Sequence, residues 1–329
     1  MTRPAISLLA SALGKSADLA EMIDSVREQT SPDWELIVAD DGASAAVLAR
    51  YAEDARIRTV SVLDNGLGPA IDAAAAAATG PFYAVVHGDG KIVPSFCERV
   101  TGLLAARPEI DALVVDALPF DADGDRSTSF HRLVGVTHEP GIGHRVTLAE
   151  VIGGRVLYST AAIREQAWKA GGGYTCDTPP LESLAMDLRM LAAGCDLRVL
   201  PEPLARYRVH GEALHDAPED QAAYDDAVER AYLGVGDLTS DPDALAALDA
   251  RLGTLRYEKA MRHARDALGA GDTAAALAHT RVALGQRRAP KPLVIAGVLT
   301  VTPGLLRRVQ LTKQQVGTLV RRAKALAGR

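Results

Sequence analysis

Acidic and small residues directly follow short apolar runs in the first ninety residues of the chain. The sequence reads Asp40-Asp41-Gly42 after one run and His87-Gly88-Asp89-Gly90 after another. Carboxylates can accept hydrogen bonds from N–H and hydroxyl donors, and hard divalent cations prefer oxygen ligands. These residues therefore indicate a ligand or cation site, if the apolar runs are neighbouring strands of one sheet.

Strand-like and helix-like segments alternate up to about residue 117. Strands are expected at 5–10, 35–39, 58–63, 82–87 and 112–117, and helices at 16–30, 44–54, 67–79 and 94–107. Strict alternation predicts βαβ units and a mostly parallel sheet flanked by helices, an α/β fold. Such sheets bind ligands beyond the carboxyl ends of their strands, so the acidic residues are expected at one rim.

The pattern changes after residue 117. A polar turn at 121–125 and a loop rich in glycine, histidine and proline precede helices expected near 147–152 and 160–170. A glycine run at 171–173, a helix at 181–193 and a strand pair at 196–200 and 204–209 follow. From about residue 216 only helical periodicity remains, including a predicted hairpin of 257–268 and 273–284.

Composition excludes several classes of protein. With 48% hydrophobic residues in 329, the chain can bury a large core and is not disordered, and 4% aromatic residues argue against an all-β sandwich. The cysteines Cys97, Cys176 and Cys195 form no CxxC pair, so neither a disulfide framework nor a zinc ribbon is expected. The first residues read as a strand rather than a signal peptide, which favours the cytoplasm.

The charge is unevenly distributed along the chain. Residues 273–329 carry 11 Lys/Arg and no Asp or Glu, whereas the first 272 residues carry 42 acidic and 25 basic side chains. The apolar stretch 291–306 is 16 residues long and contains Gly297, Pro303 and Gly304, too short to span a bilayer. Its basic flanks predict peripheral attachment to an anionic membrane surface; the alternative is a helix packed on the rest of the protein.

Several motifs together resemble family 2 glycosyltransferases of the inverting GT-A type. They are SVREQTSPDWELIVADDGAS, DNGLGPAIDAAAAAATG, VVHGDG, GGGY and PEPLARYRVHGE, in this order within residues 4–215. The resemblance implies a GT-A domain at 1–215, with a nucleotide-sugar half at 1–117 and an acceptor half at 118–215. Residues 216–329 would form an appended helical region with a basic tail.

The resemblance also implies residues that bind the nucleotide-sugar donor. They follow successive strands or begin the helices after them: Ser11, Ala12, Asp40, Asp41, Gly66, Gly68, Asp72, Gly88 and Arg208. For Asp40 and Asp41 an ordinary Asp-Gly turn is the alternative interpretation.

The clearest departure from the family is at the cation site. Family members carry Asp-x-Asp where this chain reads His87-Gly88-Asp89. Asp89, His87 and His210 are the expected metal ligands, and the imidazole favours Mn²⁺ over Mg²⁺. Asp89 alone as ligand is the alternative. A literal Asp-x-Asp at 121–123 is rejected because a β-turn explains those residues.

The general base is the second departure. Family members carry a Glu-Asp pair whose carboxylate deprotonates the acceptor hydroxyl, and this chain reads Glu182-Ser183. Glu182 is therefore expected to act as base, with Asp187 as the second candidate; alternatively, Glu182 only complements the dipole of its helix.

The resemblance implies inverting sugar transfer from a nucleotide-diphosphate sugar to an acceptor hydroxyl on a glycan, a lipid-linked molecule or the cell envelope. No nucleic-acid partner is expected. The altered motifs leave open a degenerate binding or scaffold protein. A sugar nucleotidyltransferase is disfavoured, because no glycine-rich loop bearing Arg or Lys follows the first strand.

Overall fold

The computed structural model describes residues 3–13, 18–63, 66–122, 124–133, 141–154, 160–174, 179, 181–209, 221–287 and 290–301. The chain divides into two compact units, residues 1–248 and 249–329. The domain boundary predicted near residue 215 falls in a stretch outside the described residues.

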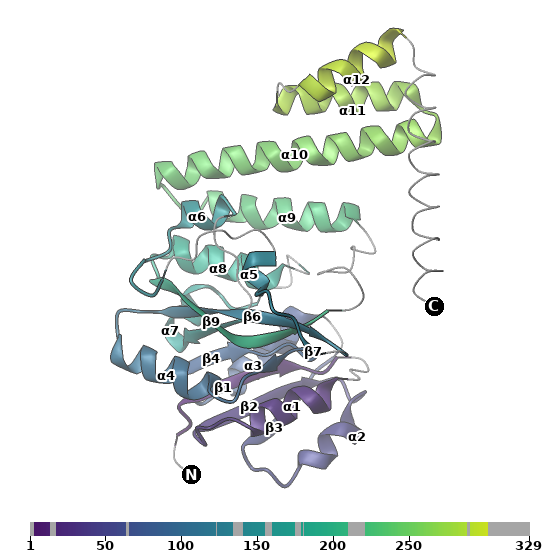
Figure 1. Ribbon diagram of the computed structural model, residues 1–329. Helices are drawn as coiled ribbons and strands as arrows, with labels where there is room; N and C mark the ends of the chain where they lie inside the picture. The colour runs from purple at the N-terminus through teal and green to yellow at the C-terminus, as the bar shows by residue number, and fades with distance from the viewer. Residues whose placement is uncertain are drawn as a thin grey trace. The chain divides into compact units, whose positions relative to one another are not determined.

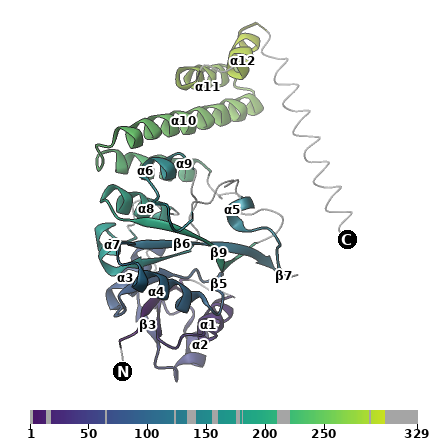
Figure 2. The ribbon, with the colours of Figure 1, turned by 60° about the vertical axis from the view of Figure 1, so that its left-hand side comes forward.

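The described strands of the first unit form one mixed sheet (Figures 1 and 2). They are β1 Ile6–Ser11, β2 Trp34–Asp40, β3 Ile57–Ser61, β4 Phe82–Val85, β5 Lys91–Ile92, β6 Ala112–Asp121, β7 Gly124–Asp125, β8 Thr160–Arg164 and β9 Leu197–Arg208. Their order is β3-β2-β1-β4-β8-β6-β9-β5, and β7 pairs with β6. Strands β1 to β4 are parallel, as predicted, whereas β8 runs antiparallel to both β4 and β6.

Helices cover both faces of this sheet. The described helices up to residue 236 are α1 Leu19–Arg27, α2 Ala45–Leu48, α3 Leu67–Ala77, α4 Phe96–Ala106, α5 Phe130–Leu133, α6 Leu148–Ile152, α7 Glu165–Ala170, α8 Glu182–Ala192 and α9 Gln221–Gly236, with a 3-10 turn at Ala49–Tyr51. All seven residues of β2 are buried, because helices pack on both of its faces. Helix α8 lies between the sheet and α9 (Figure 1).

Two sequence predictions for this unit are wrong. Residues 160–164, expected as the start of a helix, form β8, because pairing with β4 and β6 overrides the helical preference of the Ala pair. The predicted strand pair at 196–200 and 204–209 is one strand, β9. Pro201 and Pro203 lack an N–H, and the pairing with β6 shifts register there without ending.

The second unit is helical. It contains residues 249–270 of α10 Pro242–Ala270, together with α11 Thr273–Gln286 and α12 Pro290–Val301. The Asp272 side chain accepts a hydrogen bond from Ala275 N at 2.9 Å and so caps α11. The predicted hairpin is confirmed, with Leu268 and Ala276 forming its buried core. Among the described residues, no helix is long and apolar enough to cross a membrane.

Candidate active site

The carboxyl ends of β2, β1 and β4 meet at one edge of the sheet. Strand β1 lies between its two parallel neighbours, with Ser11 paired to Ala39 and Leu9 to Val85. Ala12 continues this arrangement by donating its N–H to Ala39 O at 2.8 Å. Ser11, Asp40 and the turn that begins at His87 therefore share a rim, as the sequence predicts.

The Asp40-Asp41-Gly42 segment forms a tight turn at this rim. The buried Asp40 carboxylate accepts a hydrogen bond from Ser44 N at 3.2 Å, and Ser44 Oγ donates to Ala12 O at 3.3 Å. Asp41 accepts from Ala43 N at 3.0 Å, and Gly42 has a φ of +96°. These bonds fix the loops that follow β1 and β2 against each other. Nucleoside contacts by Asp40 and Asp41 stay a prediction.

Helix α3 presents its first turn at the same end of the sheet. Gly66 precedes the helix with a φ of +101°, a conformation that favours glycine, and Gly68 is buried. Asp72, one turn further on, receives the N–H of Tyr174 at 2.7 Å. Gly66 and Gly68 are thus placed at the rim, while Asp72 is engaged by a second loop.

His87 and Asp89 occupy one tight turn after β4. Gly90 N donates to His87 O at 2.9 Å and closes the turn. Neighbouring protein atoms desolvate the His87 imidazole and lower its pKa, and the Asp89 carboxylate partly opposes this shift. A neutral imidazole and a carboxylate on one turn are a donor set that Mn²⁺ accepts.

A cation here would need further ligands from the substrate. In the part of the chain that the structure describes, no cluster of three or more His, Cys, Asp or Glu side chains could hold a metal ion. An ion held by His87 and Asp89 would need oxygen ligands from outside these two residues. His210, the third expected ligand, lies outside the described residues.

Helix α8 places two polar residues beside this turn. A cavity of about 20 Å³, large enough for a water molecule, lies between β4, β8, the Tyr174 loop and α8. Its lining residues are Val85, His87, Thr160, Ala161, Ile163, Tyr174, Ser183, Met186 and Asp187. Ser183 and Asp187 are four residues apart and therefore share one face of the helix.

The two candidate bases differ in their surroundings. Both carboxyls are buried, and burial raises the pKa of each; for Asp187 the pKa lies well above its usual range, although Arg189 opposes the shift. Asp187 lines the cavity that also contains His87, whereas Glu182 does not. Raised carboxyl pKa values in a cleft are typical of catalytic sites.

Arg208 is engaged by acidic side chains of α1. Its guanidinium lies 3.3 Å from the Asp18 carboxylate, forms an ion pair with Glu21 and stacks over the Phe120 ring at 4.5 Å. Lys91 forms a further ion pair with Glu21. Donor binding by Arg208 would require exchange of these partners and stays a prediction.

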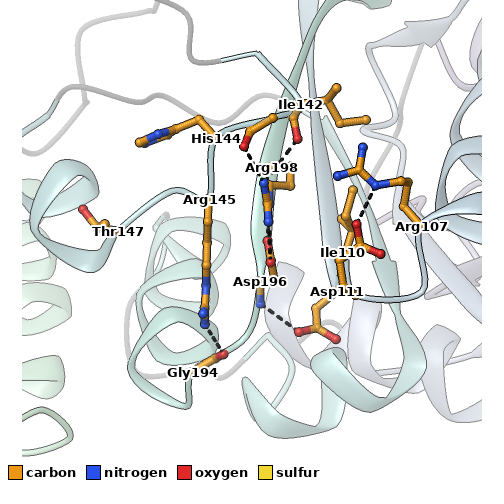
Figure 3. Close-up of polar contacts among 12 residues, drawn as sticks. Arg107, Ile110, Asp111, Ile142, His144, Arg145, Thr147, Gly194, Asp196 and Arg198 are labelled. Carbon is orange, nitrogen blue, oxygen red and sulfur yellow. Dashed lines mark hydrogen bonds and ion pairs between the residues drawn. The ribbon is translucent and has the colours of Figure 1, made fainter.

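A larger cavity, of about 520 Å³, lies at the opposite edge of the sheet. It adjoins the start of β9, and its lining includes Arg145, Thr147, Cys195 and Asp241. Figure 3 shows Arg145 beside this edge, where its guanidinium donates to Gly194 O at 2.6 Å. None of the predicted site residues lines this cavity.

The rejected Asp-x-Asp segment is part of a hairpin. Asp121 pairs with Gly124 where β6 turns into β7, Gly124 has a φ of +116°, and Arg126 binds Asp121 at 3.2 Å. The prediction of a turn is confirmed for these residues, and Asp123 lies outside the described residues.

Sequence reasoning missed three residues that shape the site. They are Tyr174, Ser183 and Arg189, from the glycine loop and α8. Ser183 could have been found, because its four-residue spacing from Asp187 places both on one helix face. The partners of Tyr174 and Arg189 required the fold.

The described site is a rim of acidic residues at the carboxyl ends of parallel strands, beside a helix with buried carboxyls. Residues 7–164, just under half of the chain, match the family model for glycosyl transferase family 2. The chain is 31% identical over 129 residues to EpsH of Bacillus subtilis, a glycosyltransferase by name, covering 38% of this chain and 37% of EpsH. It is 32% identical over 137 residues to the O-antigen biosynthesis protein RfbC of Myxococcus xanthus, covering 40% of this chain and 11% of RfbC. Both matches thus span well under half of the relative.

Solved structures share the fold. S. aureus TarS 1-349 in complex with UDP-GlcNAc superposes with a TM-score of 0.60 at 13% identity, covering 94% of this chain and 91% of that one. The mannosyltransferase PcManGT from Pyrobaculum calidifontis, in complex with GDP-Man and Mn²⁺, gives 0.59 at 16% identity, covering 94% and 85%. The fold is GT-A, with a C-terminal helical region.

Proposed function

We propose that the protein transfers a glycosyl group from a nucleotide-diphosphate sugar to an acceptor hydroxyl with inversion. The observation that carries the proposal is the cavity in which Asp187 and Ser183 of α8 meet His87 of the strand-end turn. The cavity supports a role for an α8 carboxylate as the base, beside the rim where family 2 members are expected to bind the donor.

The reaction needs no covalent intermediate on the protein. The acceptor oxygen bonds to the anomeric carbon as the bond to the diphosphate oxygen breaks, and the acceptor proton passes to a carboxylate. The nucleoside diphosphate leaves with the bonding electrons. A divalent cation held by His87 and Asp89 would neutralise charge on the diphosphate.

Asp187 is the base that the geometry favours. Family members have an acidic residue at the position of Ser183, and Asp187 stands one helical turn later on the same face. The carboxylate would thus be displaced by one turn while facing the same cavity. Glu182 is the second candidate, since it is buried at the start of the helix and has a raised pKa.

A donor assay tests the function and separates it from its rivals. The protein is incubated with UDP-GlcNAc or GDP-Man, with and without Mn²⁺, and the release of nucleoside diphosphate is measured. A nucleotidyltransferase would instead release pyrophosphate from a nucleoside triphosphate and a sugar phosphate. Nucleotide-sugar binding without turnover on any donor and acceptor panel would support the degenerate binding protein.

The acidic limb of the pH–rate profile is expected to lie above the range of an ordinary carboxyl, about pH 4. A base acts only when ionised, and burial raises the pKa of Asp187, so kcat falls as the pH is lowered through that raised value. The measurement is kcat against pH, with the Tm recorded at each pH as a stability control. A kcat that stays constant down to pH 4.5 would contradict this assignment.

We further propose that the basic end of the chain attaches the enzyme to the cytoplasmic face of the cell membrane. Leu293 and Val294 of α12 are 57% and 63% exposed, while the neighbouring Ile295 packs on the α10–α11 core. Basic side chains precede the helix and follow the apolar stretch. This combination suits insertion of apolar side chains below anionic headgroups. An acceptor that is lipid-linked or part of the envelope would then share the surface with the enzyme.

Charge reversal at the tail is expected to abolish this attachment. The full chain should sediment with phosphatidylglycerol vesicles at low salt and not with phosphatidylcholine vesicles, and Arg287→Glu combined with Lys291→Glu should remain in the supernatant. The matched control is Arg132→Glu with Arg230→Glu, two exposed arginines of the first unit. Equal recovery of the wild type in both supernatants would refute membrane attachment.

A further inference from the structure

A loop of three glycines lies against Asp72 of α3. Gly172 and Gly173 have φ values of +73° and +68°, which favour glycine. A Cβ on Gly173 would collide with the Asp72 carboxylate, so the backbone itself packs on this side chain. Only glycine at position 173 allows the loop to approach so closely.

Two side chains, one from α3 and one from α8, hold this loop. Asp72 Oδ1 accepts the Tyr174 N–H at 2.7 Å. Arg189 of α8 donates from Nε to Gly171 O at 2.5 Å and from Nη2 to Gly173 O at 2.6 Å. The loop therefore joins α3, whose first turn lies at the donor rim, to the helix that carries Asp187.

The residue that this loop positions is Tyr174. Its ring is buried and stacks on Trp168 at 5.3 Å between centroids, and Trp168 meets Tyr83 of β4 edge-on at 5.8 Å. Tyr174 forms part of the wall of the cavity that contains His87 and Asp187. A displaced loop would thus change the shape of that cavity.

The charges around the loop support a fixed arrangement. Burial raises the pKa of the Asp72 carboxyl, while its hydrogen bond from Tyr174 N and the nearby Arg189 oppose the shift. Burial and the carboxylates of Asp187, Glu182 and Asp72 raise the pKa of the Tyr174 phenol, which therefore keeps its proton. Asp72 and Arg189 are thus opposite charges that contact the same glycine loop.

We infer that Asp72 and Arg189 are positioning residues, which set the place of Tyr174 and Asp187 relative to His87 through the Gly171–Gly173 backbone. This inference rests on the proposed glycosyl transfer. It gives Asp72 a role different from donor binding, since its oxygen is directed to the Tyr174 amide. Misplacement of a catalytic group by about 1 Å can reduce the rate about 100-fold.

Steady-state kinetics of Asp72 variants test the inference. With UDP-GlcNAc or GDP-Man, whichever the wild type uses, Asp72→Ala should lower kcat about 10- to 100-fold and leave the donor Kd within about twofold of wild type. Asp72→Asn keeps an oxygen acceptor for the Tyr174 amide and should recover most of kcat. The matched control, Glu202→Ala, removes an ion pair with Arg99 away from this loop and should keep wild-type kcat.

A second variant and a spectroscopic readout cover the case in which Asp72→Ala does not fold. Arg189→Lys offers one ammonium group in place of the two guanidinium donors and should show the same split between kcat and donor Kd. Because Trp168 stacks on Tyr174, both variants should change tryptophan emission without substrate, whereas Glu202→Ala should not.

Three outcomes would overturn the inference. They are an unchanged kcat in Asp72→Ala, a large rise in the donor Kd at constant kcat, and a failure of Asp72→Asn to recover activity. Failure of the proposed function is distinct, because the wild type itself would then release no nucleoside diphosphate while the emission change in the variants persisted.

Discussion

Asp187→Asn is expected to lower kcat about 100- to 10,000-fold while the donor Kd stays near the wild-type value. Asparagine has nearly the shape of aspartate but cannot take up the proton of the acceptor hydroxyl. Asp187 is buried in the cavity that also contains His87 and Ser183, so the loss should affect proton transfer rather than donor binding. Transfer rates give kcat, and calorimetry with the donor gives Kd.

A second variant makes this prediction specific. Glu182→Gln is the matched control, since Glu182 is buried on the same helix with a raised pKa but does not line the cavity. If Glu182 is the base instead, Glu182→Gln loses transfer and Asp187→Asn keeps it. A donor that no longer binds to Glu182→Gln would place Glu182 in the donor pocket.

A rescue variant tests the displacement of the carboxylate along α8. Ser183→Asp added to Asp187→Asn restores an acid on the same helix face, one turn earlier, and Ser183 is exposed at the cavity. We expect partial recovery of kcat in the double variant. A double variant that binds the donor normally but recovers no activity would argue against this displacement. A carboxylate at position 183 would then not reach the acceptor hydroxyl that Asp187 deprotonates.

The nucleotide half of the fold was predictable because its determinants are local. Apolar runs separated by helical patterns gave four parallel strands and their order along the chain, and parallel pairing then places Ser11, Asp40 and His87 at one edge. The second half depends on distant pairing. Nothing within residues 160–164 shows that β4 and β6, far away in sequence, will take them as an antiparallel strand.

The site shows the same limit. The acidic strand ends and the helix with Glu182 and Asp187 could be predicted, because each depends on neighbouring residues. The bond between Asp72 and Tyr174 joins positions 102 residues apart, and the sequence alone indicates only that both are polar. The ion pair between Arg208 and Glu21 could not be predicted from the sequence either, since the two residues are 187 positions apart.

Asp89→Ala is expected to remove the stimulation of transfer by Mn²⁺ and to lower kcat at saturating Mn²⁺ at least about 100-fold. Asp89 is the carboxylate of the His87–Gly90 turn at the carboxyl end of β4. Its loss leaves an imidazole as the one predicted ligand in that turn, so the charge developing on the diphosphate loses its stabilisation. Nucleoside diphosphate release measured against Mn²⁺ concentration gives both effects.

The variant His87→Asp separates a role of the turn in metal binding from a role in folding. It restores two carboxylates two residues apart, which suits Mg²⁺ better than a mixed imidazole and carboxylate pair. We therefore expect His87→Asp to retain activity with Mn²⁺ and to gain activity with Mg²⁺, while Asp89→Ala responds to neither ion. Mn²⁺ binding can be measured without turnover by calorimetric titration in the presence of UDP or GDP. Asp89→Ala should then bind Mn²⁺ more weakly than wild type and His87→Asp. Unchanged activity in Asp89→Ala, or equal Mn²⁺ affinity in wild type and Asp89→Ala, would remove Asp89 from the site and leave the leaving group to be stabilised by other residues.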